Sequence, residues 1–185
     1  NLHKKEKIEL KNLNFKKIDF DLQFADLNNF YNHIKKNITK PIFIKNSNFF
    51  FRDQNKKIIL ISKINNIDYF IDLKNKEKKI TILGNLFGSD FTFNWNKNYL
   101  NSHVSKSNLK FKNPNINILN EFNNFPKDFI NVETNVSFLN NNLDLNYKFN
   151  KDKIVFIQPQ NQNRLSHNSK LIGDINLNPF FFNLT

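Results

Sequence analysis

The segment "DFTFNWN" (Asp90–Asn96) decides the fold class, because apolar and polar residues alternate along its whole length. Successive side chains of a β-strand point to opposite faces, so Phe91, Phe93 and Trp95 would share one face. The residues between them are all polar and would occupy the other face. The period of two therefore predicts a strand that is apolar on one side and polar on the other.

The same alternation recurs in four other segments of the chain. They are "KIDFDLQF" (17–24), "NVETNVSF" (131–138), "NNLDLNYKFN" (141–150) and "LIGDINL" (171–177). Further strand candidates occupy residues 6–15, 42–51, 57–64, 67–73, 79–87, 99–106, 108–112, 115–119 and 153–158. The separators are short and rich in Asn and Lys, as in "RDQNKK" and "LKNKEKK", and such residues support tight turns. Since parallel strands need long crossovers, short turns predict an antiparallel meander.

Helical patterns are scarce. In "ADLNNFYNHIKKN" (25–37), Asp26 is placed to cap a helix and several apolar residues follow at helical spacing. A second short helical turn is predicted within "NILNEFNNFPKDF" (117–129). With only three glycines and five prolines, no flexible linker divides the chain. We therefore expect residues 1–185 to form a single, mainly β domain with one or two short helices.

The charge of the chain is strongly basic, with a net charge of +12 and a pI near 9.8. Such a balance ordinarily suggests nucleic acid or an anionic membrane surface as a partner. However, only Arg52 and Arg164 are arginines, and the lysines are interspersed with Asp and Glu. About one residue in five is asparagine, and the abundance of Asn, Lys, Ile and Phe matches the codon bias of an AT-rich genome. Nucleic acid is therefore a disfavoured partner.

Motifs for catalysis or metal binding are not found in the sequence. The chain has no cysteine, which excludes thiolate nucleophiles and zinc–thiolate sites. The four histidines share no metal-binding spacing; they are His3, His33, His103 and His167. "GNLFG" (84–88) lacks the Lys-Ser/Thr pair of a phosphate-binding loop and predicts a bend or bulge. We expect a non-enzymatic binding protein without a cofactor.

By its spacing alone, the carboxylate pair Asp19 and Asp21 resembles an acid–base pair. Both residues fall on the polar face of the strand predicted at 17–24. Solvated charges on the wet side of an amphipathic strand explain their positions, so no catalytic role is assigned to them.

Strands with one apolar face have two main uses. In a β-sandwich the apolar face is buried against a second sheet. In an open, curled sheet it lines a groove for apolar ligands. The chain has 22 phenylalanines and few small apolar residues, whereas close-packed cores mix large and small side chains. This favours a groove for acyl chains, but alternation alone does not separate the two, and a structural or protein-binding β-sandwich module is the alternative.

Three segments resemble AsmA-like proteins, the family that includes TamB and YhdP. They are "PIFIKNSNFFFRDQNKKIILISKINNIDYFIDLKN" (41–75), "LGNLFGSDFTFNWN" (83–96) and "KLIGDINLNPFFFNLT" (170–185). The resemblance implies a β-sheet curled lengthwise into a hydrophobic groove, similar to an open barrel. It further implies phospholipid acyl chains as ligands, envelope proteins as partners, and a role in phospholipid transfer and outer-membrane maintenance.

The resemblance also carries expectations about place and site. The protein would be periplasmic and anchored to the inner membrane through a segment outside this sequence, within a longer repetitive protein. In "KLIGDINLNPFFFNLT", Asn178 and Pro179 would separate one strand from the start of another. The lipid-binding groove face would consist of Ile18, Phe20, Leu22, Phe24, Phe91, Phe93, Trp95, Leu143, Leu145, Tyr147, Phe149, Leu171, Ile175 and Leu177.

Overall fold

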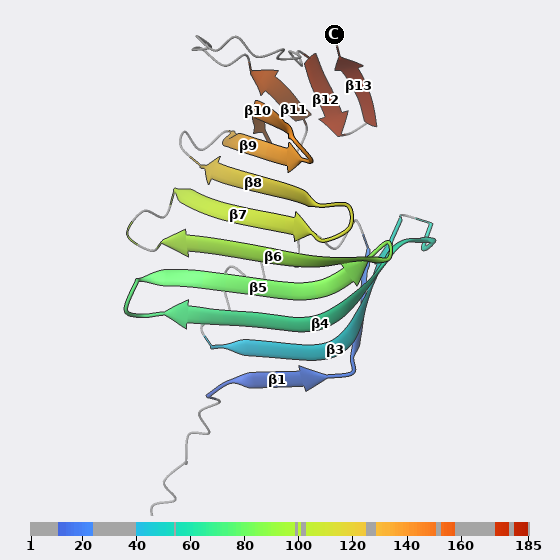
Figure 1. Ribbon diagram of the computed structural model, residues 1–185, viewed down its shortest axis with the longest axis vertical. Helices are drawn as coiled ribbons and strands as arrows, with labels where there is room; N and C mark the ends of the chain where they lie inside the picture. The colour runs from blue at the N-terminus through green and yellow to red at the C-terminus, as the bar shows by residue number, and fades with distance from the viewer. Residues whose placement is uncertain are drawn as a thin grey trace, which may run out of the picture.

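The computed structural model describes residues 11–23, 40–53, 55–98, 100, 103–124, 129–150, 153–157, 173–177 and 180–184, the last two ranges by backbone only. These residues form one sheet of 13 strands (Figure 1). The strands are β1 (Leu13–Lys16), β2 (Asp19–Gln23), β3 (Ile42–Arg52), β4 (Ile58–Asp72), β5 (Glu77–Leu86), β6 (Ser89–Asn98), β7 (Val104–Phe111), β8 (Ile116–Asn123), β9 (Ile130–Phe138), β10 (Asn141–Phe149), β11 (Lys153–Ile157), β12 (Gly173–Leu177) and β13 (Phe180–Leu184).

From β3 to β13 the sheet is an antiparallel meander, as the sequence predicts. Each strand pairs with the one before it, and the two edges of the sheet do not pair with each other. The β5–β6 turn has two central residues, Phe87 and Gly88, with positive φ angles of 52° and 79°. Such a turn matches the right-handed twist of the strands it connects. The bend predicted at "GNLFG" is therefore confirmed, and the sheet is open.

At one edge the structure departs from a pure meander. β1 and β2 lie end to end along the same edge of β3 and run parallel to it. A parallel neighbour requires a long crossover, and residues 24–41 supply one between β2 and β3. The sequence prediction of an all-antiparallel sheet is wrong here, because this connection is not a short turn. The helix predicted at 25–37 lies entirely within this stretch and outside the described residues.

Some predicted element boundaries are wrong. The candidates at 57–64 and 67–73 are one strand, β4, and those at 99–106 and 108–112 are merged in β7. The helical turn predicted within 117–129 is also wrong over its first part, because β8 occupies Ile116–Asn123 and pairs with β7 and β9. No helix occurs in the part of the chain that the structure describes.

The strands keep a register that gathers apolar side chains on one side of the sheet. Residues directly opposite each other on neighbouring strands share a face. One continuous row of such partners crosses β4 to β10 and consists of Ile67, Ile82, Phe93, Leu109, Ile118, Val136 and Leu143. We call the face that carries this row the apolar face and the opposite one the polar face.

Burial shows which way the sheet curls. Every residue that the structure buries lies on the apolar face, including Ser47 and Val132, which are each only 1% exposed. Among the described residues, only Ile64, Tyr69 and Val132 are buried hydrophobics. The sheet therefore curls toward its apolar face, so that small side chains are covered by larger neighbours. No second layer of described residues covers that face.

A corner in the sheet produces part of this curvature. Lys17, between β1 and β2, and Asn46 in β3 have positive φ angles of 54° and 51°. Next to Asn46, the extra residue Asn65 forms a bulge in β4 opposite Gly84 of β5. Bulges bend strands and increase their twist. Aligned across four neighbouring segments, these irregularities bend the sheet, and Figure 1 shows β3, β4 and β5 curving at this end.

Glycine is required at position 84 because there is no room for a Cβ atom, not because its backbone angles are unusual. A Cβ atom there would lie 2.5 Å from the main-chain oxygen of Lys63 and 2.9 Å from the ring of Phe91. The Phe91 ring therefore packs directly over Gly84 on the apolar face, beside Phe111 at a centroid distance of 6.1 Å. The glycine allows the bulged strand and the aromatic ring to approach together.

We expect Gly84→Ala to destabilise the protein by about 1–3 kcal/mol, because the new methyl group overlaps backbone that cannot move freely. Urea unfolding followed by the fluorescence of Trp95, the single tryptophan, measures the change. The matched control is Gly88→Asn, since nothing lies within 4 Å of that position and Asn tolerates a positive φ. Equal losses for the two variants would contradict the proposed role of Gly84.

Candidate functional site

The main candidate site is the central part of the apolar face. Beside the row defined above, which ends at Leu143, a second row of cross-strand partners consists of Ile64, Gly84, Phe91, Phe111, Ile116 and Phe138. We call these two the apolar rows. With strands about 4.8 Å apart, the six spacings from β4 to β10 extend over about 29 Å. No charged or hydrogen-bonding side chain interrupts either row.

The apolar rows are only partly covered. Phe138 and Leu143 are 39% and 41% exposed, and most of the other members are half-buried. In a sandwich the facing sheet would exclude water from all of them. The neighbouring side chains of the curled sheet shield one another, but no other described residues cover their outer surfaces. Large half-exposed apolar surfaces of this kind mark interaction sites.

The structure brings most of the predicted groove residues together on the apolar face. They are Phe20, Leu22, Phe91, Phe93, Trp95, Leu143, Leu145, Tyr147 and Phe149. Ile18 precedes β2 rather than lying in it, and its main-chain N–H donates to Ser47 Oγ at 3.2 Å. Phe24 and Leu171 lie outside the described residues. Ile175 and Leu177 belong to β12, where Ile175 pairs with Ile154 and Leu177 with Phe180.

Several members of the same face are missing from the predicted groove list. In β4 and β5 they include Ile64, Ile67, Ile80 and Ile82. The bulge at Asn65 shifts the period by one residue, so the alternation in "ISKINNIDYF" is broken where the strand itself continues. The "NN" at this break is the one signal in the sequence that points to a bulge.

A hydrogen-bonded polar group crosses the apolar face beside the apolar rows. Asn120 Nδ2 donates to Ser107 Oγ at 3.0 Å, and Thr134 Oγ1 donates to Asn120 Oδ1 at 2.6 Å. Tyr147 Oη lies 3.4 Å from Thr134 Oγ1 and extends the group to β10. Ser107 and Thr134 are buried, so these bonds satisfy polar atoms that would otherwise be costly to cover. We call Ser107, Asn120, Thr134 and Tyr147 the polar band.

Two lysines lie on the apolar face at the same end of the strands as the polar band. Lys78 of β5 is directly opposite Lys97 of β6, and both are half-buried. Ser105 of β7 is the next partner in this row. Like charges placed opposite each other on one face repel and destabilise a sheet. The sequence predicts the position of only one of these lysines. Lys97 continues the alternation that begins at Phe91, which places it on the same face.

The acidic groups of this region lie on the polar face. Lys79 Nζ contacts Asp72 Oδ2 at 3.0 Å and Glu77 Oε2 at 3.2 Å. Hydrogen bonds from the main chain and side chain of Asn75, and then from Lys79, hold the pKa of Asp72 far below its ordinary value of 3.8. The same ion pairs, that with Asp72 first, raise the pKa of Lys79. The carboxylates of Asp72 and Glu77 are therefore paired with Lys79 on the polar face.

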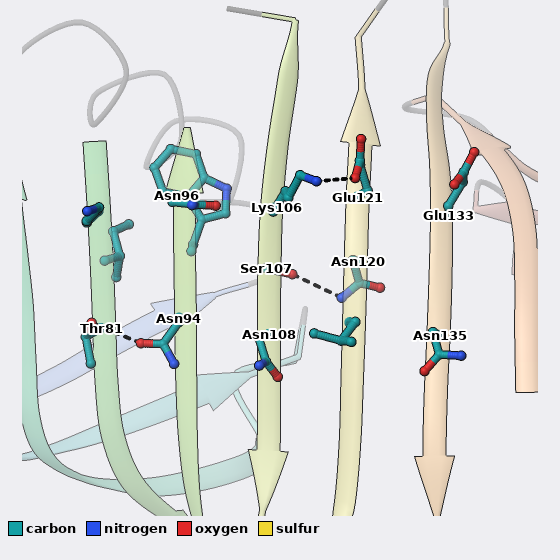
Figure 2. A pocket seen from close by; sticks show the side chains of 14 residues that line it. Thr81, Asn94, Asn96, Lys106, Ser107, Asn108, Asn120, Glu121, Glu133 and Asn135 are labelled. Carbon is teal, nitrogen blue, oxygen red and sulfur yellow. Dashed lines mark hydrogen bonds and ion pairs between the residues drawn. The ribbon is translucent and has the colours of Figure 1, made fainter. Parts of the chain in front are cut away.

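The polar face has a shallow depression of about 480 Å³ over β5 to β9 (Figure 2). Its walls are mainly amide and charged side chains, with a Thr81–Asn94 hydrogen bond of 3.1 Å and a Lys106–Glu121 ion pair of 2.6 Å. Asn108 Oδ1 is buried there without a hydrogen-bond partner among the described residues. The sequence interpretation treats this face as solvated and misses the depression. Its groups can bind polar ligands but include no nucleophile–base arrangement.

Two further features of the described ranges concern metal binding and membranes. No cluster of three or more His, Cys, Asp or Glu side chains there is arranged to hold a metal ion. No helix among these residues has the length and apolar character needed to span a bilayer.

Comparison of the chain with known proteins finds no match to a protein family, to a curated protein or to a solved structure.

The Asp72 site predicts a specific pH dependence. Because the folded state lowers the pKa of Asp72, its ionised form stabilises the fold above about pH 4, and this contribution is lost as the pH falls further. We expect Asp72→Asn to be less stable than the wild type at pH 6, with the difference shrinking from pH 4 to pH 2. Urea titrations at each pH measure both proteins. A difference that stays constant over this range would contradict the assignment.

Proposed function

We propose that this protein is a non-enzymatic lipid-binding module that holds phospholipid acyl chains against its apolar face. The observation that carries the proposal is the pair of apolar rows, one extending over seven strands and the other over six, which no second layer of described residues covers. A surface of this size exposed to water is costly, and an apolar ligand would remove that cost.

The dimensions of the apolar rows suit an acyl chain. A bilayer core of about 30 Å contains two opposed leaflets, so one acyl chain needs about 15 Å. The rows offer about 29 Å across the strands. Each buried methylene contributes about 0.8 kcal/mol, so a chain is held by burial without polar contacts. Half-exposed Phe, Ile and Leu side chains adapt to such a ligand, since no second layer of described residues fixes their outer surfaces.

The resemblance to AsmA-like proteins suggests a cellular role for this binding. Under this proposal the chain is a segment of a periplasmic, membrane-anchored protein that moves phospholipids between membranes or maintains the outer membrane. The apolar face is then one section of a longer path for lipid. Its open sheet edges, at β1 and β2 on one side and at β13 on the other, are suited to pairing with further strands.

The test compares two substitutions on adjacent residues of β6. Phe93→Glu places a charge on the apolar face, whereas Asn94→Glu places the same charge on the polar face. We expect the wild type and Asn94→Glu to copurify with phospholipid, measured by mass spectrometry of an organic extract. Phospholipid per protein should fall about tenfold or more in Phe93→Glu, because a carboxylate is poorly tolerated against acyl chains.

Leu145→Glu and Asn146→Glu repeat the comparison on β10, where the two residues again occupy opposite faces. Circular dichroism of each variant shows whether the sheet persists. Folded but lipid-free wild-type protein would overturn the proposal. Unfolding of both apolar-face variants, with the wild type free of lipid, would favour the alternative, a structural or protein-binding module whose apolar face is covered by protein.

A further inference from the structure

Four hairpin turns lie at one end of the sheet, on the right-hand side of Figure 1. Two of them carry a large apolar residue at the tip, since Phe87 is 82% exposed and Leu139 is 73% exposed. Beside a third turn, β4 begins with Ile58 and Ile59, which are 45% and 56% exposed. We call these two isoleucines and the four turns together the turn edge. The turns consist of residues 53–57, 87–88, 112–115 and 139–140.

Phe87 and Leu139 occupy backbone positions that do not favour large apolar residues. Both have positive φ angles, of 52° and 53°. Bulky residues seldom adopt this region, and hairpin turns use Gly, Asn or Asp there. Each turn therefore combines an unfavourable backbone conformation with an apolar side chain that the described residues leave exposed to water. Burial of these side chains in an apolar medium outside the protein would offset both costs.

Lysines accompany the apolar tips. Lys56 and Lys57 lie in the β3–β4 turn and Lys112 lies in the β7–β8 turn. All three are exposed, and none forms an ion pair with another described residue. The one carboxylate within the four turns, Asp53, accepts main-chain hydrogen bonds of its own turn, and Asp90 of β6 accepts one from a neighbouring asparagine. The turns therefore carry an excess of positive charge.

From this combination we propose that the turn edge docks on the surface of an anionic phospholipid bilayer. Phe87 and Leu139 enter the boundary between head groups and acyl chains, and the lysines contact the head-group phosphates. The two tips are four strand spacings apart, about 19 Å along the sheet, so one flat surface can receive both. A nucleic acid would also match the lysines, but it offers no hydrocarbon for the tips.

The turn edge lies outside the apolar rows, so its docking does not depend on the acyl-chain binding proposed above. The two features are nevertheless adjacent. Phe138, a member of the second apolar row, directly precedes Leu139. A docked turn edge therefore places that row beside the bilayer.

The experiment measures cosedimentation of the full chain with phosphatidylcholine vesicles that contain or lack phosphatidylglycerol. We expect the wild type to bind the anionic vesicles. The double variant F87N/L139N should bind them about tenfold more weakly or worse, because two large apolar side chains lose their burial. Since Asn tolerates a positive φ, this variant should be at least as stable as the wild type in urea.

The matched control is L73N/L100N, which replaces two leucines in turns at the opposite end of the strands. These leucines are 81% and 77% exposed, much like Phe87 and Leu139. The control should bind anionic vesicles as the wild type does. Equal losses in the two double variants would show a general effect of exposed apolar residues and overturn the docking surface.

A second pair of variants tests the charge. K56Q/K57Q removes two lysines from the β3–β4 turn, and K74Q/K76Q removes two exposed lysines from the β4–β5 turn at the opposite end. We expect about tenfold weaker binding to anionic vesicles for the first variant alone. Equal weakening by both variants would mean that only the net charge matters, and the turn edge would not be the contact.

The remaining outcomes separate this docking from binding at the apolar face. If Phe93→Glu abolishes vesicle binding while F87N/L139N retains it, the apolar face contacts the membrane and the turn edge does not. Wild-type protein that binds neither kind of vesicle would overturn the docking. It would leave the proposed acyl-chain binding standing if phospholipid still copurifies with the protein.

Discussion

The constraint on which this structure depends is the pairing register of neighbouring strands. Because each side chain alternates between faces, a slip of one residue would transfer a strand's apolar residues to the polar side. The cross-strand partners keep apolar side chains in two common rows, one from β4 to β10 and the other from β4 to β9 with Gly84 among its members. Short turns enforce this register, and the bulge at Asn65 restores it where β4 contains one residue too many.

The same constraint explains the distribution of burial. A single sheet cannot bury its own face completely, so the described part of the chain buries mostly small residues, such as Ser47 and Ser107, beneath larger neighbours. The corner formed by Lys17, Asn46, Asn65 and Gly84 increases this shielding by curling the sheet. What remains is a curved apolar surface that no second layer of described residues covers. Fold and candidate site are therefore two consequences of one pattern of side chains.

Much of this architecture could be predicted from the sequence, because period two is a strong signal where nothing interrupts it. The alternate apolar residues from Phe91 to Trp95 and from Leu143 to Phe149 lie on the predicted face. The signal fails where geometry is not periodic. The bulge at Asn65 hides the continuity of β4, and the amide and glutamate in "NILNEFN" hide the second half of β8, of which only 115–119 is predicted as a strand. The parallel pairing of β1 and β2 depends on a crossover whose partner no local pattern specifies.

The sequence predicted which residues share the apolar face, but not which of them are neighbours across the strands. Which residues stand opposite each other depends on register, and register places Lys78 against Lys97 and joins the polar band across four strands. Neither arrangement follows from one segment taken alone. The amide-lined depression on the polar face likewise arises from five strands together. Pairing between distant segments is thus the information that the structure adds.

The central claim is that acyl chains contact the apolar face, and the single tryptophan, Trp95, lies on that face. The most direct measurement is quenching of Trp95 emission by a phospholipid with bromine atoms on its acyl chains, compared with the same lipid without bromine. We predict strong quenching by the brominated lipid alone. Bound brominated lipid that leaves Trp95 emission unchanged would contradict the claim.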